Sequence, residues 1–307
     1  MTLPALFATF TNNLLPVLLI GGSGFLIGKL IPIDTRSIGR VAFNFFSPVL
    51  VFNLLVTSSL RLDQALSTVV FTCLVLVSMG LLAFLLGRLF KLERPLLLAL
   101  ILTTTFGNTG NYGLPLVKFA LGDDALAFAT IFFVTTWLFF NTAGVFIASL
   151  GQMDFKTALL GLFKVPTGYA VILAVIVNAL NIELPLPLAR TVSLAADGTI
   201  PLLLILLGLE LTRVEWSHNL RALGLGASLK LLAGPVVGLL FASLLGLQGV
   251  SRQANVVQAS MPPAVMSTVL ASEYKLEPPL VTAIIFVSTI LSPLTLTPLL
   301  VFLTSSK

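Results

Sequence analysis

Thr130–Thr136 reads TIFFVTT and Ala283–Thr289 reads AIIFVST, an offset of 153 residues between equally apolar surroundings. The same offset pairs Pro48 with Pro201. We interpret this similarity as the duplication of a unit that contains five apolar segments. An odd number of membrane crossings per unit inserts the second copy upside down. Such inverted repeats are typical of secondary transporters, whose binding site lies where the two repeats meet.

The composition indicates a protein that crosses a membrane many times. Hydrophobic residues make up 57% of the 307 residues and charged residues 9%, and the mean hydropathy is +1.07, so a water-soluble surface cannot be assembled. Each span takes about 20 residues, and only a helix satisfies its own backbone within a continuous apolar run. We therefore predict an all-α polytopic membrane protein with ten transmembrane helices, in two inverted five-helix repeats at 1–152 and 153–307. The spans are expected at 8–31, 36–57, 65–89, 95–120, 124–150, 157–180, 188–211, 220–246, 252–273 and 278–303.

The basic residues predict the orientation of the chain. Eleven Lys and Arg residues fall in the odd-numbered connections and five in the even-numbered connections and the C-terminus. This bias places the odd connections in the cytoplasm and both termini outside, in the inner or plasma membrane of the cell. It also explains the formal net charge of +5 without a nucleic-acid partner.

Two spans contain residues that interrupt a helix. The fourth contains TTTFGNTGNYGLP, Thr103–Pro115, and its partner in the ninth contains NVVQASMPP, Asn255–Pro263. Glycines such as Gly110 weaken a helix, and Pro115 removes a donor, so we expect a break near 108–111. Irregular backbone at membrane depth is tolerated only where it is buried in protein or lines a watery cavity. We predict that these two broken helices, four and nine, face each other.

Two broken helices that face each other predict a site for an anion. Each half-helix that begins inside the membrane carries about half a positive charge at its N-terminus, and amide side chains bind a carboxylate without the cost of a buried charge. The alternative is that these polar groups only satisfy freed backbone, or, for Ser and Thr, bond to their own helices. The predicted binding residues are Asn108, Gly110, Asn111, Tyr112, Pro115, Asn255 and Gln258, with Thr135, Thr136, Ser288 and Thr289 from the repeated stretches.

Ionisable residues within the spans are candidates for ion coupling. Lys230 lies nine residues past Arg221, about 13 Å into the membrane, where a lysine needs a partner or a cavity. Asp197 lies four residues before Pro201, as Asn44 lies four before Pro48. We predict that Asp197 pairs with Lys230, and that Asp197, Lys230 and Asn44 are positions for proton or sodium coupling. An alternative for Asp197 is capping of freed backbone amides.

The sequence resembles the auxin efflux carrier family, which includes compact prokaryotic members known as malonate or organic-acid permeases and is related to the sodium/bile-acid symporters. The resemblance rests on GNTGNYGLPL at 107–116, on the run at 197–211, and on the tail from Met261. It implies a scaffold of spans 1, 2, 6 and 7, a mobile transport domain of spans 3–5 and 8–10 in which the broken helices four and nine cross, and a homodimer formed through the scaffold. It also places the family's site on 108–112 and on Met261, Pro262 and Pro263.

The resemblance implies a small mono- or dicarboxylate, auxin-like or malonate-like, as the solute. The proline that plant carriers have at the first crossing is absent, and the connection at 150–164 is short, which places the chain with the compact members. The alternatives are a sodium-coupled symporter of a larger amphipathic anion and an anion channel. The single histidine, His218, and single cysteine, Cys73, provide no metal site or enzymatic constellation, so we expect no enzyme, no cofactor and no metal.

Overall fold

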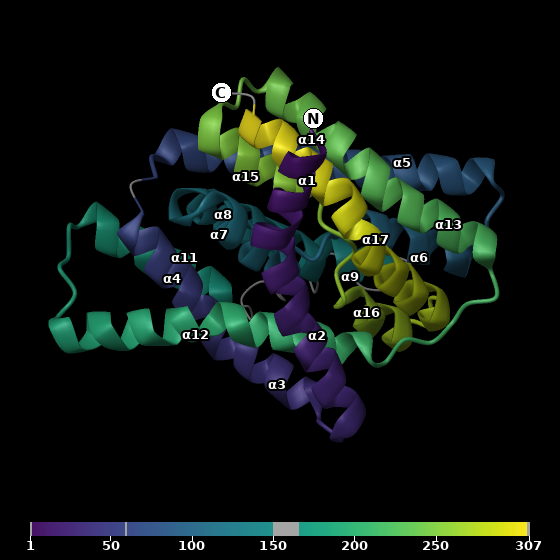
Figure 1. Cartoon of the computed structure of the whole chain (residues 1–307), viewed down its shortest axis with the longest axis horizontal. Coiled ribbons are helices and arrows are strands. Elements are labelled where there is room, and N and C mark those ends of the chain that lie inside the picture. The colour runs from purple at the N-terminus through teal and green to yellow at the C-terminus, as the bar shows by residue number, and fades with distance from the viewer. Residues whose placement is uncertain (1, 59, 150–165, 306–307) are drawn as a thin grey trace.

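The computed structural model describes residues 2–58, 60–149 and 166–305, and every regular element within them is a helix (Figure 1). Seven helical segments of this described part are long and apolar enough to cross a membrane: Leu3–Leu30, Thr35–Thr57, Leu62–Leu89, Asp123–Ala148, Leu186–Leu211, Leu220–Leu244 and Pro278–Ser305. The all-α, multi-span prediction is confirmed. The predicted boundary between the repeats and the start of the sixth span lie outside the described residues, and ten spans in inverted repeats stay a prediction.

Helix ends in the first half lie within a few residues of the expected ends. The elements, in which η marks a wide π-type turn, are α1 (Leu3–Thr9), η1 (Phe10–Leu14), α2 (Leu15–Leu30), α3 (Thr35–Val41), η2 (Ala42–Phe46), α4 (Ser47–Thr57), α5 (Leu62–Leu89), α6 (Arg94–Thr105), η3 (Thr109–Gly113), α7 (Leu114–Leu121), α8 (Asp123–Phe139), η4 (Phe140–Gly144) and α9 (Val145–Ala148).

The second half continues with further helices and one more wide turn. They are α11 (Pro166–Ala179), α12 (Leu186–Leu211), α13 (Leu220–Ser228), η6 (Leu229–Ala233), α14 (Gly234–Leu244), α15 (Gly249–Ala259), α16 (Ser267–Glu273) and α17 (Pro278–Ser305).

Proline explains most of the wide turns. Pro16, Pro48, Pro115 and Pro235 each stand second in the helix that directly follows η1, η2, η3 or η6. A proline ring clashes with the carbonyl four residues before it and provides no N–H. One additional residue in the preceding turn moves that carbonyl away, as in the π-bulges of other helices.

Helices α2 and α12 pack closely through glycine. A Cβ on Gly24 would collide with the backbone of Ile205, and one on Gly208 with the backbone of Gly21. Small residues let membrane helices approach this closely, which increases their van der Waals contact. Figure 1 shows α12 running across α2.

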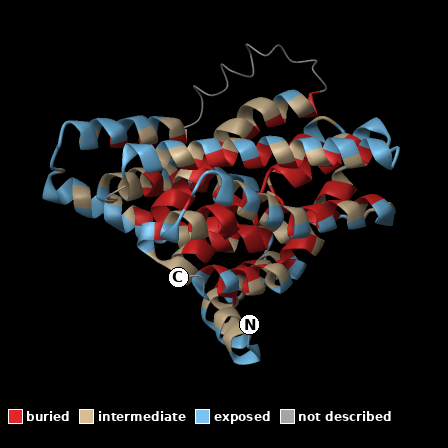
Figure 2. Ribbon diagram, turned by 90° about the horizontal axis from the view of Figure 1, so that it is seen from above, coloured by how far each residue is buried: buried red, intermediate tan, exposed pale blue. Residues whose placement is uncertain are grey.

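The interior is formed by helices that the others surround. Figure 2 shows the buried residues gathered in the middle of the molecule and the exposed ones on its outer helices. Helix α8 is buried at nearly every residue from Ala125 to Thr136, and α15 is buried from Ala254 to Ala259. Both helices pack beside the interrupted segment after α6.

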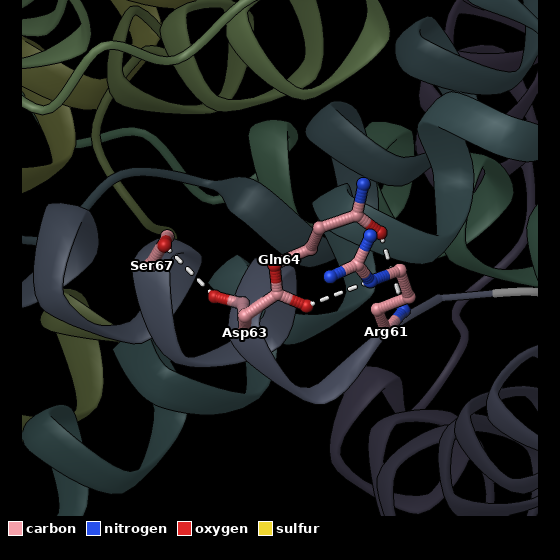
Figure 3. A network of polar contacts seen from close by, with 4 residues as sticks. All are labelled: Arg61, Asp63, Gln64 and Ser67. Carbon is pink, nitrogen blue, oxygen red and sulfur yellow. Dashed lines mark hydrogen bonds and ion pairs between the residues drawn. The ribbon is translucent and has the colours of Figure 1, made fainter.

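At the periphery, α5 begins with a short polar network (Figure 3). The Gln64 side chain accepts a hydrogen bond from the Arg61 backbone amide at 3.1 Å, and the Arg61 side chain forms an exposed ion pair with Asp63. Ser67 donates to the Asp63 carbonyl. The amide contact satisfies one of the donors that a helix N-terminus leaves free.

Candidate functional site

The two interrupted helices meet. Helix α6 ends at Thr105, residues 106–108 are not helical, and the chain turns back into helix at η3. Helix α15 ends at Ala259, and residues 260–266 lead to α16. The predicted breaks are therefore present, the first beginning slightly earlier than expected. Gly107 and Pro263 form an isolated antiparallel bridge, so the two segments pair where they cross.

Backbone hydrogen bonds hold the crossing together. The Asn108 amide donates to the Pro262 carbonyl at 2.7 Å, and the Ala264 amide donates to the Phe106 carbonyl at 2.9 Å. Buried backbone groups must find partners inside the protein. Because these backbone groups bond to each other, they do not need the Asn108 side chain as a partner.

A small cavity of about 30 Å³ lies against this crossing, which is space on the scale of a water molecule. Asn108, Gly110, Asn111 and Thr136 line it. The Asn108 Nδ2, Asn111 Oδ1 and Thr136 Oγ1 atoms are buried and have no protein partner. A buried polar atom without a partner is costly, so these three atoms indicate a place where a polar ligand or water is bound.

Aromatic rings form one wall of the cavity. The Trp137 ring stacks on Phe43 at 5.2 Å and on Phe140 at 5.8 Å between ring centroids, and Phe106 meets Phe140 edge to face. Phe133 completes the wall. None of these rings was among the predicted site residues, because an aromatic residue in an apolar span looks the same in sequence whether it faces lipid or a cavity.

One partly buried carboxylate reaches the crossing from α12. Asn111 Nδ2 donates to Glu210 Oε2 at 3.3 Å. Glu210 stands one residue before the end of α12. Glu210 was not among the predicted site residues, because its contact with Asn111 depends on the face of α12 that it occupies.

Glu210 also lines a large vestibule of about 880 Å³. The vestibule shares Phe43, Trp137, Val265 and Met266 with the cavity at the crossing, so the two spaces adjoin. Its charged lining residues are Arg36, Arg40, Arg213, Glu210, Glu215 and Glu273. The three arginines can contact an anion, and the three glutamates balance them in formal charge.

A second large cavity, of about 760 Å³, lies toward the other end of α12. Asp197 lines it, together with Arg61, Lys118, Asp123 and Asp124. Asp197 and Glu210 are separated by about 20 Å along the helix axis. No residue that lines this cavity also lines the cavity at the crossing.

Lys230 is buried at the crossing, but the prediction that it pairs with Asp197 is wrong. Its Nζ donates to the Thr104 carbonyl at 3.1 Å, and no carboxylate of the described residues lies within ion-pair distance of it. Asp197 is exposed in the other cavity. The Thr104 carbonyl is left free because Asn108 donates to Pro262 instead, and a cation is favourable at a helix C-terminus.

The other predicted binding residues do not line the cavity. Met261, Pro262 and Pro263 form the second segment of the crossing. Asn255 bonds to Thr68 and Ser251, Gln258 to the carbonyls of Thr109 and Ala129, Tyr112 to Ser292, and Thr135 to its own helix. Pro115 begins α7, and Ser288 and Thr289 are buried on α17. Asn44 lines the vestibule and bonds to the Arg40 carbonyl.

Comparison with known proteins identifies the family. The model of a family described as "Membrane transport protein" matches residues 9–157 and 152–300. The chain belongs to this family. An "Uncharacterized transporter" of Methanothermobacter thermautotrophicus is 28% identical over 292 residues, 94% of this chain and 96% of the relative.

Two further relatives of this transport protein carry names that mention a solute. A "Putative malonate transporter" of Rhizobium meliloti is 29% identical over 208 residues, 65% of each chain. "Auxin efflux carrier component 1" of Arabidopsis thaliana is 32% identical over 120 residues, 38% of this chain and 19% of that carrier. The resemblance to the auxin efflux carrier family is thereby confirmed, and the chain is a multi-pass membrane transport protein rather than an enzyme.

Proposed function

We propose that the chain is a secondary transporter of a small organic anion, which binds at the crossing of the two interrupted helices. The observation that carries this proposal is the pair of buried donor atoms without partners at the cavity, Asn108 Nδ2 and Thr136 Oγ1. The N-terminal turn of η3 adds backbone amides beside them, and such amides favour an anion. The first amides of a helix have no partner within it.

The cavities support movement by alternating access. The crossing adjoins the vestibule lined by Arg36, Arg40 and Arg213, and it shares no lining residue with the cavity around Asp197. A site open to one side and closed to the other is the arrangement that alternating access needs, whereas a channel needs a continuous pore. By the bias of basic residues, the open side faces the cytoplasm.

The proposal includes the architecture predicted from the sequence. Ten helices form two inverted repeats, spans 1, 2, 6 and 7 form a scaffold, and spans 3–5 and 8–10 move against it. The close contact of α2 with α12, which belong to spans 1 and 7, supports a rigid scaffold. We further propose a homodimer through this scaffold, in the inner or plasma membrane, with both termini outside.

The aromatic wall supports a second candidate solute. Stacked rings at Phe43, Trp137 and Phe140 offer a flat apolar surface, which suits an amphipathic or aromatic acid better than a compact dicarboxylate. The space at the crossing is small in this state, so a ring would have to extend toward the vestibule. A malonate-like solute needs only the polar atoms as partners, but it is also larger than this cavity and would extend toward the vestibule.

Uptake into proteoliposomes tests the proposal. Purified protein should accumulate labelled malonate or labelled indole-3-acetate above protein-free liposomes, and the unlabelled acid should compete. Replacing sodium by choline distinguishes a sodium-coupled symporter, whose uptake would stop, from the other mechanisms. Uptake of neither acid above protein-free liposomes would contradict the proposed solute class. A large unitary current with either anion would indicate a channel.

A further inference from the structure

Glu210 is distinguished from the other charged groups of the vestibule by its position. Arg36, Arg40, Arg213, Glu215 and Glu273 are exposed, whereas Glu210 is partly buried and bonded to Asn111. Arg213 lies three residues after Glu210 in the chain but forms no ion pair with it. Among the described residues, the one side-chain hydrogen bond to the Glu210 carboxylate comes from a neutral amide.

Elements that pack against α12 bring further charged groups near Glu210. Helix α3 carries Arg36 and Arg40, which line the vestibule with Glu210. Lys29 of α2 lies over the Phe25 ring, Lys118 of α7 pairs with Asp123, and Tyr112 of η3 bonds to Ser292. The segments α4 and η2 contain no titratable side chain. No cation of the described residues forms an ion pair with the Glu210 carboxylate.

Asn111 provides an independent observation. Its Nδ2 donates to Glu210, while its Oδ1 is buried without a partner. An amide has two donors and one acceptor oxygen, and an ionised carboxylate is only an acceptor, so it leaves that oxygen unpaired. A protonated carboxyl group has an O–H that can donate to Oδ1 while its other oxygen accepts from Nδ2. A proton on Glu210 therefore completes a two-bond pair.

An anion bound at the crossing is a second reason for Glu210 to carry a proton. Asn111 lines the cavity and contacts Glu210, so a carboxylate bound beside Asn108 and Asn111 lies about one side chain away from Glu210. Two carboxylates so close in surroundings of low polarity do not both stay ionised. Binding of the anion therefore favours the protonated form of Glu210.

We propose that Glu210 is the proton-coupling residue, taking one proton from water when an organic anion binds at the crossing and returning it to water when the anion leaves. The anion and one proton then move together. This inference rests on the proposed function, and it replaces Asp197, Lys230 and Asn44 as coupling positions. No oxidant, metal or other reactant is needed, since the step is the transfer of one proton between hydronium and the Glu210 carboxylate.

Malonate binding to the purified protein at several pH values tests the coupling. Above the range where malonate itself titrates, the wild-type Kd should rise about tenfold for each pH unit over which Glu210 ionises in the free protein, because each bound anion requires one proton. Glu210→Gln should bind malonate with a Kd independent of pH. Glu215→Gln, which alters another carboxylate of the vestibule, should keep the wild-type slope. A pH-independent wild-type Kd, or the wild-type slope in Glu210→Gln, would overturn the inference.

An infrared titration tests the proton site without any solute. As the pH is lowered and Glu210 of the free protein takes up its proton, the wild-type spectrum should gain the carbonyl stretch of a buried protonated carboxylic acid, which is absent from Glu210→Gln and present in Glu215→Gln. The same signal in Glu210→Gln would overturn the assignment to Glu210. The two claims fail separately: absence of saturable malonate binding at every pH counts against the proposed solute, and binding without a pH slope counts against the coupling.

Discussion

The Asn108 amide donates to the Pro262 carbonyl at 2.7 Å and so joins the interrupted helices of the two halves of the chain. This bond uses the backbone of Asn108 and leaves its side chain facing the cavity without a partner. The crossing is therefore held by main-chain atoms, while side chains at the same positions are available for a ligand. Variants of the side chains should change binding more than they change folding.

Gly208→Ala should destabilise the contact between α2 and α12. The added Cβ would overlap the Gly21 carbonyl, which belongs to the backbone and cannot turn aside, so we expect a loss of about 1–3 kcal/mol, as for other overpacked sites. Thermal unfolding in detergent measures it. Gly22→Ala is the matched control because its Cβ would meet no atom within 4 Å; equal unfolding temperatures for the two variants would contradict the close packing.

Gln258→Ala should destabilise the protein more than Gln253→Ala, although both residues belong to α15. Gln258 donates to the Thr109 and Ala129 carbonyls in the buried interior, whereas Gln253 donates to the Leu303 carbonyl in a partly buried position. Each lost bond costs about 0.5–1.5 kcal/mol. Chemical or thermal unfolding compares the two variants, and a larger effect at Gln253 would count against the role of Gln258 in fixing η3.

Lys230→Met should destabilise the protein by about 1–3 kcal/mol, because the buried Thr104 carbonyl loses its partner. Its effect should add to that of Asp197→Asn, since the two side chains do not meet. A double-mutant cycle on unfolding free energies should give a coupling within about 0.5 kcal/mol of zero. A coupling energy well above that range would show that the two charges interact.

Trp137 should report binding through its fluorescence. The protein has two tryptophans, and Trp216→Phe leaves Trp137, which stacks on Phe43 and Phe140 at the cavity. Addition of malonate should change the Trp137 emission in a saturable manner. The change should disappear when Asn108→Ala is added, and its full persistence there would place the anion elsewhere.

Much of the fold follows from the sequence because the signals are long and local. Apolar runs predict the spans, and Gly110, Pro115 and Pro262 predict the two breaks. The directions of the side chains near the breaks could not be predicted from the sequence. Irregular backbone turns Tyr112 toward Ser292 and leaves Asn108 and Asn111 at the cavity, and no sequence period governs such directions.

The errors have the same origin. Lys230 and Asp197 were paired by depth and sign, but Lys230 bonds to a carbonyl that only the crossing leaves free. Glu210 was overlooked because its nearness to the site depends on how α12 packs against η3. Contacts between distant segments determine these positions, whereas sequence patterns describe one segment at a time.

Malonate uptake by Asn108→Ala proteoliposomes tests the central claim most directly, with Asn12→Ala, an exposed asparagine on η1, as the matched control. A hydrogen bond to a charged ligand is worth about 1.5–3 kcal/mol, so uptake at limiting malonate should fall roughly 10- to 100-fold in Asn108→Ala. Asn12→Ala should match the wild type, and all three proteins should unfold at similar temperatures. Wild-type uptake by Asn108→Ala would contradict a binding site at the crossing.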